Sequence, residues 1–133
     1  MKQSRNKIVT FGMLPQSELP AFYNALDVFV VTTLYYQGLD MVLQEAVLCG
    51  AAPVVANVGS LKRTMVPSDE YGSVFNVGDH QDLLRKLLML MRNRSEMERI
   101  GTNAMNRAHK LFTREGMTES YAGLFYSLQT KLE

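Results

Sequence analysis

The stretch from Gln37 to Gly50 contains two acidic side chains whose positions suit the binding of a small polar ligand. Asp40 stands before a run of helix-forming residues, where a carboxylate accepts the free backbone N–H groups of a first helical turn. A glycine turn that leads into a helix N-terminus favours an anion, because free N–H groups and the positive end of the helix dipole face it. The sequence therefore predicts an anion-binding turn at Gly38 and a helix that ends at Gly50.

Glu45 lies one turn inside that helix, among side chains that are mostly apolar. We expect the helix to be buried on most sides, where a carboxylate is costly unless it is hydrogen-bonded. One interpretation is a structural glutamate that is satisfied by a backbone group or an arginine. The other is a carboxylate directed at ligand hydroxyls, such as the two of a ribose.

Apolar runs bounded by turns predict the elements that position this stretch. The expected strands are 8–12, 28–32, 52–56 and 71–76. The other expected helices run over about 18–26 after a Ser17 cap, over 61–65, after Asp79, from a capping box at Ser95, and after Thr113. The methionines and aromatic residues on the C-terminal helices are expected to face the core or another domain.

Strands that alternate with helices predict an α/β fold. We expect a partial Rossmann-like parallel sheet of about four strands, flanked by helices, with a helical C-terminal segment. Such sheets bind ligands at the carboxyl ends of their strands. The turns at Gly38 and Gly59 both follow expected strands, so they are predicted to border one crevice.

Composition excludes several classes of protein. The chain has 133 residues, which suits one domain or part of one, and a net charge of +1, which gives no footprint for nucleic acid. Cys49 is the single cysteine, and the two histidines, His80 and His109, are isolated, so no metal site is predicted. The polar N-terminus is not a secretory signal and no run is long enough to span a membrane, which together predict a cytoplasmic domain.

Several short motifs follow one another in an order that is specific as a set. They are Phe11-Gly12, Glu18-Leu19-Pro20 with Tyr23, 25–30, the Gly38 loop with Glu45-Ala46 and Gly50, 53–56, Val58-Gly59 and Gly72. From about residue 8 onward the chain resembles the C-terminal, donor-binding half of the large retaining glycosyl transferase group 1 family, which has the GT-B fold. The variant Gln-Gly-Leu-Asp at 37–40 is similar to a divergent, plant-type branch of that family.

The resemblance implies that residues 1–133 are a single C-terminal domain that binds a nucleoside-diphosphate sugar, such as a UDP-sugar, without a metal or other cofactor. It implies that Glu45 binds the ribose hydroxyls of this donor. It also implies that the loop of Gln37, Gly38, Leu39 and Asp40 meets the sugar and the diphosphate.

Four positions depart from the family's pattern. Gln37 stands where the family has a first glutamate, and the amide carries no charge to stabilise a cationic transition state. Asp40 replaces a glycine, and its carboxylate would repel a nearby phosphate. After Gly59, Ser60 and Arg63 replace a glycine and an acidic residue; we expect Arg63 to be an exposed arginine rather than a phosphate ligand.

The family's N-terminal acceptor-binding domain and its basic diphosphate-binding pair have no counterpart in the chain. We therefore expect a hexosyl- or glycosyltransferase in a full-length protein, acting on an unknown acceptor, whereas these residues alone are expected to be inactive and marginally stable or self-associating. One alternative is a non-catalytic, degenerate GT-B module used for assembly or regulation. Another is an unrelated flavodoxin-like binding domain, although Asp27 precedes a strand rather than following one.

Overall fold

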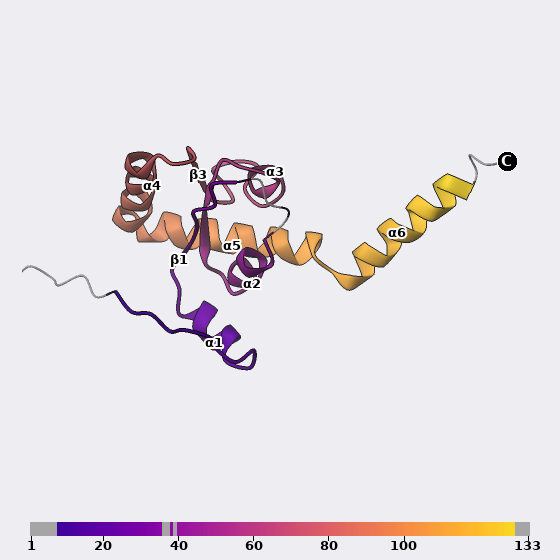
Figure 1. Ribbon diagram of the computed structural model, residues 1–133, viewed down its shortest axis with the longest axis horizontal. Coiled ribbons are helices and arrows are strands. Elements are labelled where there is room, and N and C mark those ends of the chain that lie inside the picture. The colour runs from indigo at the N-terminus through magenta and orange to yellow at the C-terminus, as the bar shows by residue number, and fades with distance from the viewer. Residues whose placement is uncertain (1–7, 36–37, 39, 130–133) are drawn as a thin grey trace, which may run out of the picture.

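Three parallel strands form the centre of the molecule (Figure 1). The computed structural model describes residues 8–35, 38 and 40–129. The strands β1 (Val28–Val31), β2 (Ala52–Ala56) and β3 (Ser73–Phe75) lie side by side in that order. Val30 is paired with Val54, and Val54 with Ser73. The parallel α/β arrangement is therefore confirmed, and the carboxyl ends of all three strands meet at one edge.

Six helices precede, connect or follow these strands in the described residues. They are α1 (Leu19–Asn24), α2 (Met41–Leu48), α3 (Leu61–Thr64), α4 (His80–Arg92), α5 (Arg94–Leu111) and α6 (Arg114–Gln129). In Figure 1, α5 runs beside the sheet and α2, and α6 projects away from the rest of the domain.

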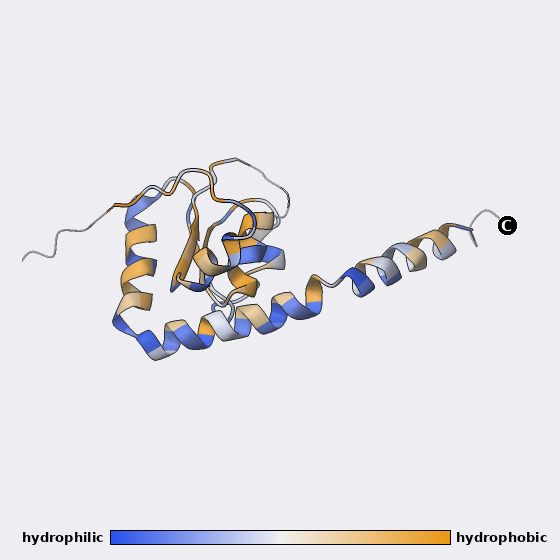
Figure 2. Cartoon of the chain, turned by 90° about the horizontal axis from the view of Figure 1, so that it is seen from below, coloured by the Kyte–Doolittle hydropathy of each residue, from blue (hydrophilic) through white to orange (hydrophobic). Residues whose placement is uncertain are grey.

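The core has two parts, because successive strand residues point to opposite faces of the sheet. Val31 and Val55 pack with the buried face of α2 and the second half of α5. Val54 and Phe75 pack on the other side with α4 and the first half of α5. All five residues of β2 are buried, and Figure 2 shows the strands as hydrophobic while α5 mixes polar and apolar residues.

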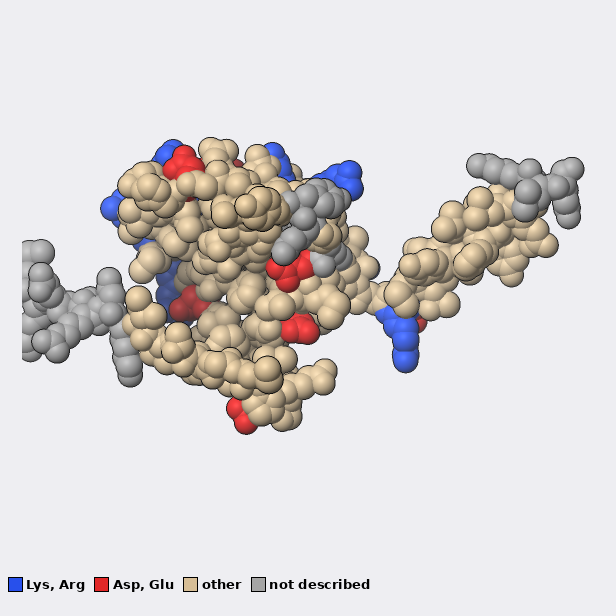
Figure 3. All heavy atoms as spheres, viewed as in Figure 1, with Lys and Arg blue, Asp and Glu red and all other residues tan. Residues whose placement is uncertain are grey.

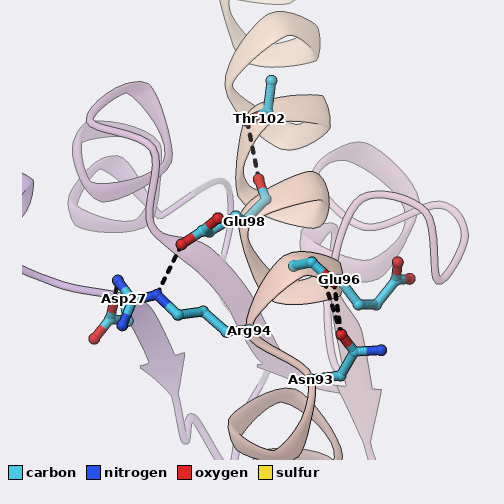
Figure 4. Close-up of polar contacts among 7 residues, drawn as sticks. Asp27, Asn93, Arg94, Glu96, Glu98 and Thr102 are labelled. Atoms are coloured by element: carbon cyan, nitrogen blue, oxygen red, sulfur yellow. Dashed lines mark hydrogen bonds and ion pairs between the residues drawn. The ribbon is translucent and has the colours of Figure 1, made fainter.

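Polar contacts at the start of α5 connect it to the residue before β1. Asn93 caps the helix, because its Oδ1 accepts the N–H of Glu96 at 3.2 Å. Arg94 lies between Glu98 and Asp27, with its Nε 2.8 Å from Glu98 Oε1 and its Nη2 3.6 Å from Asp27 Oδ1 (Figure 4). These side chains are largely exposed, so the ion pairs orient α5 more than they stabilise it.

The strand expected over residues 8–12 is absent, which is a correction to the expected sheet of about four strands. Ile8 is 92% exposed and Phe11 is 60% exposed. Among the described residues no strand pairs with this segment, and a strand without a neighbour has no ladder of hydrogen bonds. Phe11 instead contacts Phe22 of α1 edge to face, with ring centroids 5.2 Å apart.

Two predicted helix caps are also wrong. Glu18 rather than Ser17 occupies the N-cap of α1, and it makes no side-chain cap hydrogen bond. The N-cap of helix α5 is Asn93, two residues before the predicted cap at Ser95. The predicted caps at Asp79 and Thr113 are confirmed by hydrogen bonds to backbone N–H groups of the following helices.

The expected apolar face of α6 is not part of the core. Its large side chains are exposed, among them Tyr121 at 58% and Phe125 at 67%. The second possibility, contact with another domain, stays a prediction.

Candidate functional site

The start of α2 is capped as the sequence predicts. Asp40 Oδ1 accepts the N–H of Val42 at 3.0 Å and that of Leu43 at 3.4 Å. These two N–H groups are among the donors that a bound anion would use at a helix N-terminus. An external anion at these amides would therefore have to displace the Asp40 carboxylate.

The end of α2 is equally well defined by local sequence. Gly50 has a φ of +91°, which a residue with a side chain adopts only with strain. Its N–H donates to Val47 O at 2.9 Å and the N–H of Ala51 donates to Ala46 O at 3.2 Å, which is the Schellman pattern. The predicted helix end at Gly50 is confirmed.

Glu45 is exposed, so the expectation that it lies in a helix buried on most sides is wrong. Leu43, Ala46 and Val47 form the buried face of α2. Met41 and Val42 are 70% and 48% exposed, and they lie four and three residues before Glu45, on the same side of the helix. Apolar neighbours in sequence therefore did not imply apolar surroundings in space.

Among the described residues, the hydrogen-bond partner of Glu45 is a tyrosine, and neither a backbone group nor an arginine. The hydroxyl of Tyr23, on α1, donates to Glu45 Oε2 at 3.0 Å. Tyr23 is 5% exposed and its ring packs with Phe29 and the buried side of α2. Burial and then the hydrogen bond to Glu45 raise the pKa of Tyr23 to about 12, so the phenol remains a donor at neutral pH. No second partner of the Glu45 carboxylate is found in the described part of the chain.

A cavity of about 320 Å³ lies between α1 and α2 beside this pair. Its lining combines the Tyr23–Glu45 pair with apolar side chains and one amide: Gln16, Leu19, Pro20, Leu48 and Cys49. Its size is at the lower end of small-molecule sites, which are mostly apolar with a few placed polar groups. The cavity suits a ligand that offers hydroxyls to Glu45 and an apolar face to Leu19 and Pro20.

The loops that were expected to border a crevice follow the carboxyl ends of β1 and β2. Gly38 and Asp40 follow β1, and the turn of 57–60 follows β2. Gln37 and Leu39 lie outside the described residues. Ser60 Oγ is buried and, within the described ranges, has no hydrogen-bond partner. Arg63 is exposed, as expected.

Tyr23 was missed as a functional candidate. It lies four residues after Leu19 and three before Leu26, a spacing that is typical of the inward face of a helix and indicates a core residue. It is 22 residues from Glu45, and no short motif joins the two. The available signal was topological. Helices α1 and α2 are adjacent to the same strand, so a tyrosine on the inward face of α1 lies within reach of α2.

Charge elsewhere is dispersed. Lys and Arg side chains are interspersed with Asp and Glu on the face shown in Figure 3. In residues 8–35, 38 and 40–129, no group of three His, Cys, Asp or Glu side chains could hold a metal ion. None of the described helices is long and apolar enough to cross a membrane.

Comparison with known proteins gives the context for this geometry. The chain is 32% identical over 111 residues to a sulfoquinovosyl transferase of Arabidopsis thaliana, a match that covers 81% of the chain and 21% of that protein. Its fold is similar to that of a sucrose-phosphate synthase from Thermosynechococcus elongatus, with a TM-score of 0.82, 24% identity, and coverage of 96% of this chain and 31% of the other. An Anabaena protein, Alr3699/HepE, solved in complex with UDP-glucose, matches with a TM-score of 0.75 and 23% identity over 83% of this chain and 30% of its own.

The chain thus spans about a fifth to a third of the length of these relatives. Residues 2–107 match the family described as glycosyl transferases group 1. This match includes the whole sheet, the capped helix α2 and the Tyr23–Glu45 pair. It excludes the unrelated flavodoxin-like alternative. The chain belongs to the glycosyl transferases group 1 family, and the relatives compared above are GT-B glycosyltransferases.

Proposed function

We propose that this chain is the C-terminal, donor-binding domain of a glycosyltransferase that transfers a sugar from a nucleoside diphosphate to an acceptor. The observation that carries the proposal is the Glu45 carboxylate, which is exposed beside a cavity and hydrogen-bonded through one oxygen only in the described residues. A carboxylate with free lone pairs accepts hydrogen bonds from neighbouring hydroxyls. We assign those hydroxyls to the ribose of the donor.

The dimensions of α2 support this placement. Glu45 is five residues beyond Asp40, which corresponds to about 7.5 Å along a helix axis. That separation is comparable to the length of a ribose joined to a diphosphate. A ribose at Glu45 would extend its diphosphate toward the loop of Gln37, Gly38, Leu39 and Asp40, and its base toward the apolar lining of the cavity.

The protein's contribution to the reaction would then be positioning and electrostatics. Holding the donor in one orientation lowers the entropic part of the barrier, and polar groups near the diphosphate stabilise its charge as it leaves. We propose transfer with retention of configuration and without a bound metal, with the acceptor held by a second GT-B domain. UDP is the nucleoside diphosphate that we propose to test first, because Alr3699/HepE was solved with UDP-glucose.

The test is calorimetric titration of the full-length protein with UDP-glucose and other nucleoside-diphosphate sugars. The substitution Glu45→Ala should weaken donor binding by about tenfold or more, since two hydrogen bonds to a charged group are lost. Glu119→Ala is the matched control, because it removes the same charge from an exposed position on α6. Equal donor affinity of Glu45→Ala and the wild type would remove Glu45 from the site.

A second candidate function is a non-catalytic module kept for assembly or regulation. The observation that favours it is the Asp40 carboxylate, which already occupies the N–H groups of Val42 and Leu43. Under this alternative the full-length protein shows no turnover, and Gln37→Glu with Asp40→Gly improves donor binding. Efficient turnover by the wild type, unchanged by Gln37→Glu, would exclude it.

A further inference from the structure

We infer that Tyr23 is a positioning residue that orients the Glu45 carboxylate for selective recognition of the donor's ribose hydroxyls; this inference rests on the proposed function. The two side chains come from different helices, and their hydrogen bond of 3.0 Å spans the wall of the cavity. An exposed glutamate without a partner would sample several rotamers. A fixed donor on one oxygen removes much of that freedom before the ligand arrives.

The rigidity of Tyr23 makes it suitable for this role. Tyr23 is 5% exposed, and its ring packs edge to face with Phe22 and Phe29, with centroid distances of 5.5 Å and 6.1 Å. The hydroxyl is therefore held by the packing of the ring, and the flexible Glu45 side chain is aligned to it. A preorganised acceptor loses less conformational entropy on binding than a mobile one.

The geometry also divides the carboxylate between two tasks. Oε2 accepts the Tyr23 hydroxyl, which leaves Oε1 for the ligand. Two hydroxyls on adjacent carbons can then share Oε1 and the remaining lone pair of Oε2. A ligand that lacks one of these hydroxyls would leave an acceptor unpaired, so the pair should favour ribose over deoxyribose.

The experiment uses the full-length protein and two probes, UDP and 2′-deoxy-UDP, with affinity measured by calorimetry. Tyr23→Phe removes the hydroxyl and keeps the ring. We expect it to weaken UDP binding on the order of three- to tenfold and to reduce the preference for UDP over 2′-deoxy-UDP. Tyr71→Phe is the matched control, because Tyr71 packs under Arg107 on a different part of the surface and does not line this cavity.

A double-mutant cycle separates an effect through Glu45 from a general loss of packing. In the Glu45→Ala background, Tyr23→Phe should change neither affinity nor ribose preference further. An unchanged ribose preference in Tyr23→Phe would overturn the inference while leaving the proposed function intact, and so would a full additional loss in the Glu45→Ala background. If the wild type and Glu45→Ala bind UDP equally, the proposed function fails and the role of Tyr23 fails with it.

Discussion

The contact between α5 and the turn after α2 depends on Gly101, and replacing this glycine should destabilise the fold. A Cβ placed at Gly101 would lie 2.3 Å from the carbonyl oxygen of Gly50 and 3.5 Å from the nitrogen of Ala52. Ordinary van der Waals contact begins at 3.4 Å, so the carbonyl would have to move by about 1 Å. Gly101 is buried, and no flexible side chain is available to absorb the shift.

The Gly50 turn resists such a shift because its neighbours are hydrogen-bonded on both sides. The N–H of Gly50 donates to Val47 O, and the N–H of Ala52 donates to Asp27 O at 3.0 Å. Inserting a methyl group into a packed site costs about 1–3 kcal/mol. Alanine is favoured over glycine in a helix by roughly 0.8–1 kcal/mol, which offsets part of that cost. We therefore expect Gly101→Ala to lose up to about 2 kcal/mol of unfolding free energy, near the upper end of this range because the clash is with backbone atoms.

Urea unfolding, monitored by circular dichroism, measures this change. The urea concentration at the midpoint should fall while the m-value stays constant. Gly123→Ala is the matched control, because Gly123 lies in α6 and an added Cβ meets nothing within 4 Å. The control should be neutral or more stable by up to about 1 kcal/mol. If Gly101→Ala is as stable as Gly123→Ala, then α5 does not approach the Gly50 turn this closely.

Two further predictions concern a buried carboxylate and a phenol. Asp82 is 7% exposed and its Oδ2 accepts the N–H of Asn76 at 2.9 Å, so Asp82→Ala should lower the unfolding free energy by about 1–2 kcal/mol in the same assay. Asp82→Asn should be closer to the wild type in stability. Equal losses in the two variants would show that the hydrogen bond contributes little. Tyr23 has a pKa raised to about 12 from 10.0, by burial and then by Glu45, so the native state holds its proton more tightly than the unfolded chain. Its stabilising contribution is complete below pH 10 and is lost as the pH rises toward 12, a decline that Tyr23→Phe should reduce in unfolding curves measured across this range.

Local chemistry was sufficient to predict the elements around the candidate site. Asp40 and Gly50 define the two ends of α2 through contacts with residues only two to five positions away, so the sequence contains the whole signal. The strands 28–32 and 52–56 were predicted within one residue, because fully apolar runs between turns are typical of buried parallel strands.

Properties that depend on distant partners were not predictable in the same way. Residues 8–12 have the composition of a strand, yet a strand exists only where another strand is available to pair with it. Glu45 has apolar neighbours along the chain, but its surroundings depend on which face of α2 meets α1 and the sheet. The Tyr23–Glu45 hydrogen bond arises from the packing of two helices, and no spacing within one element encodes it.

Glu45 is the residue that we propose to bind the ribose of a nucleotide-linked sugar. The most direct measurement is a crystal structure of the full-length protein with UDP bound. We expect Glu45 Oε1 to lie about 2.5–3.0 Å from a ribose hydroxyl oxygen, with Tyr23 still donating to Oε2. A nucleotide bound elsewhere, with the cavity between α1 and α2 empty, would show that Glu45 does not bind the ribose.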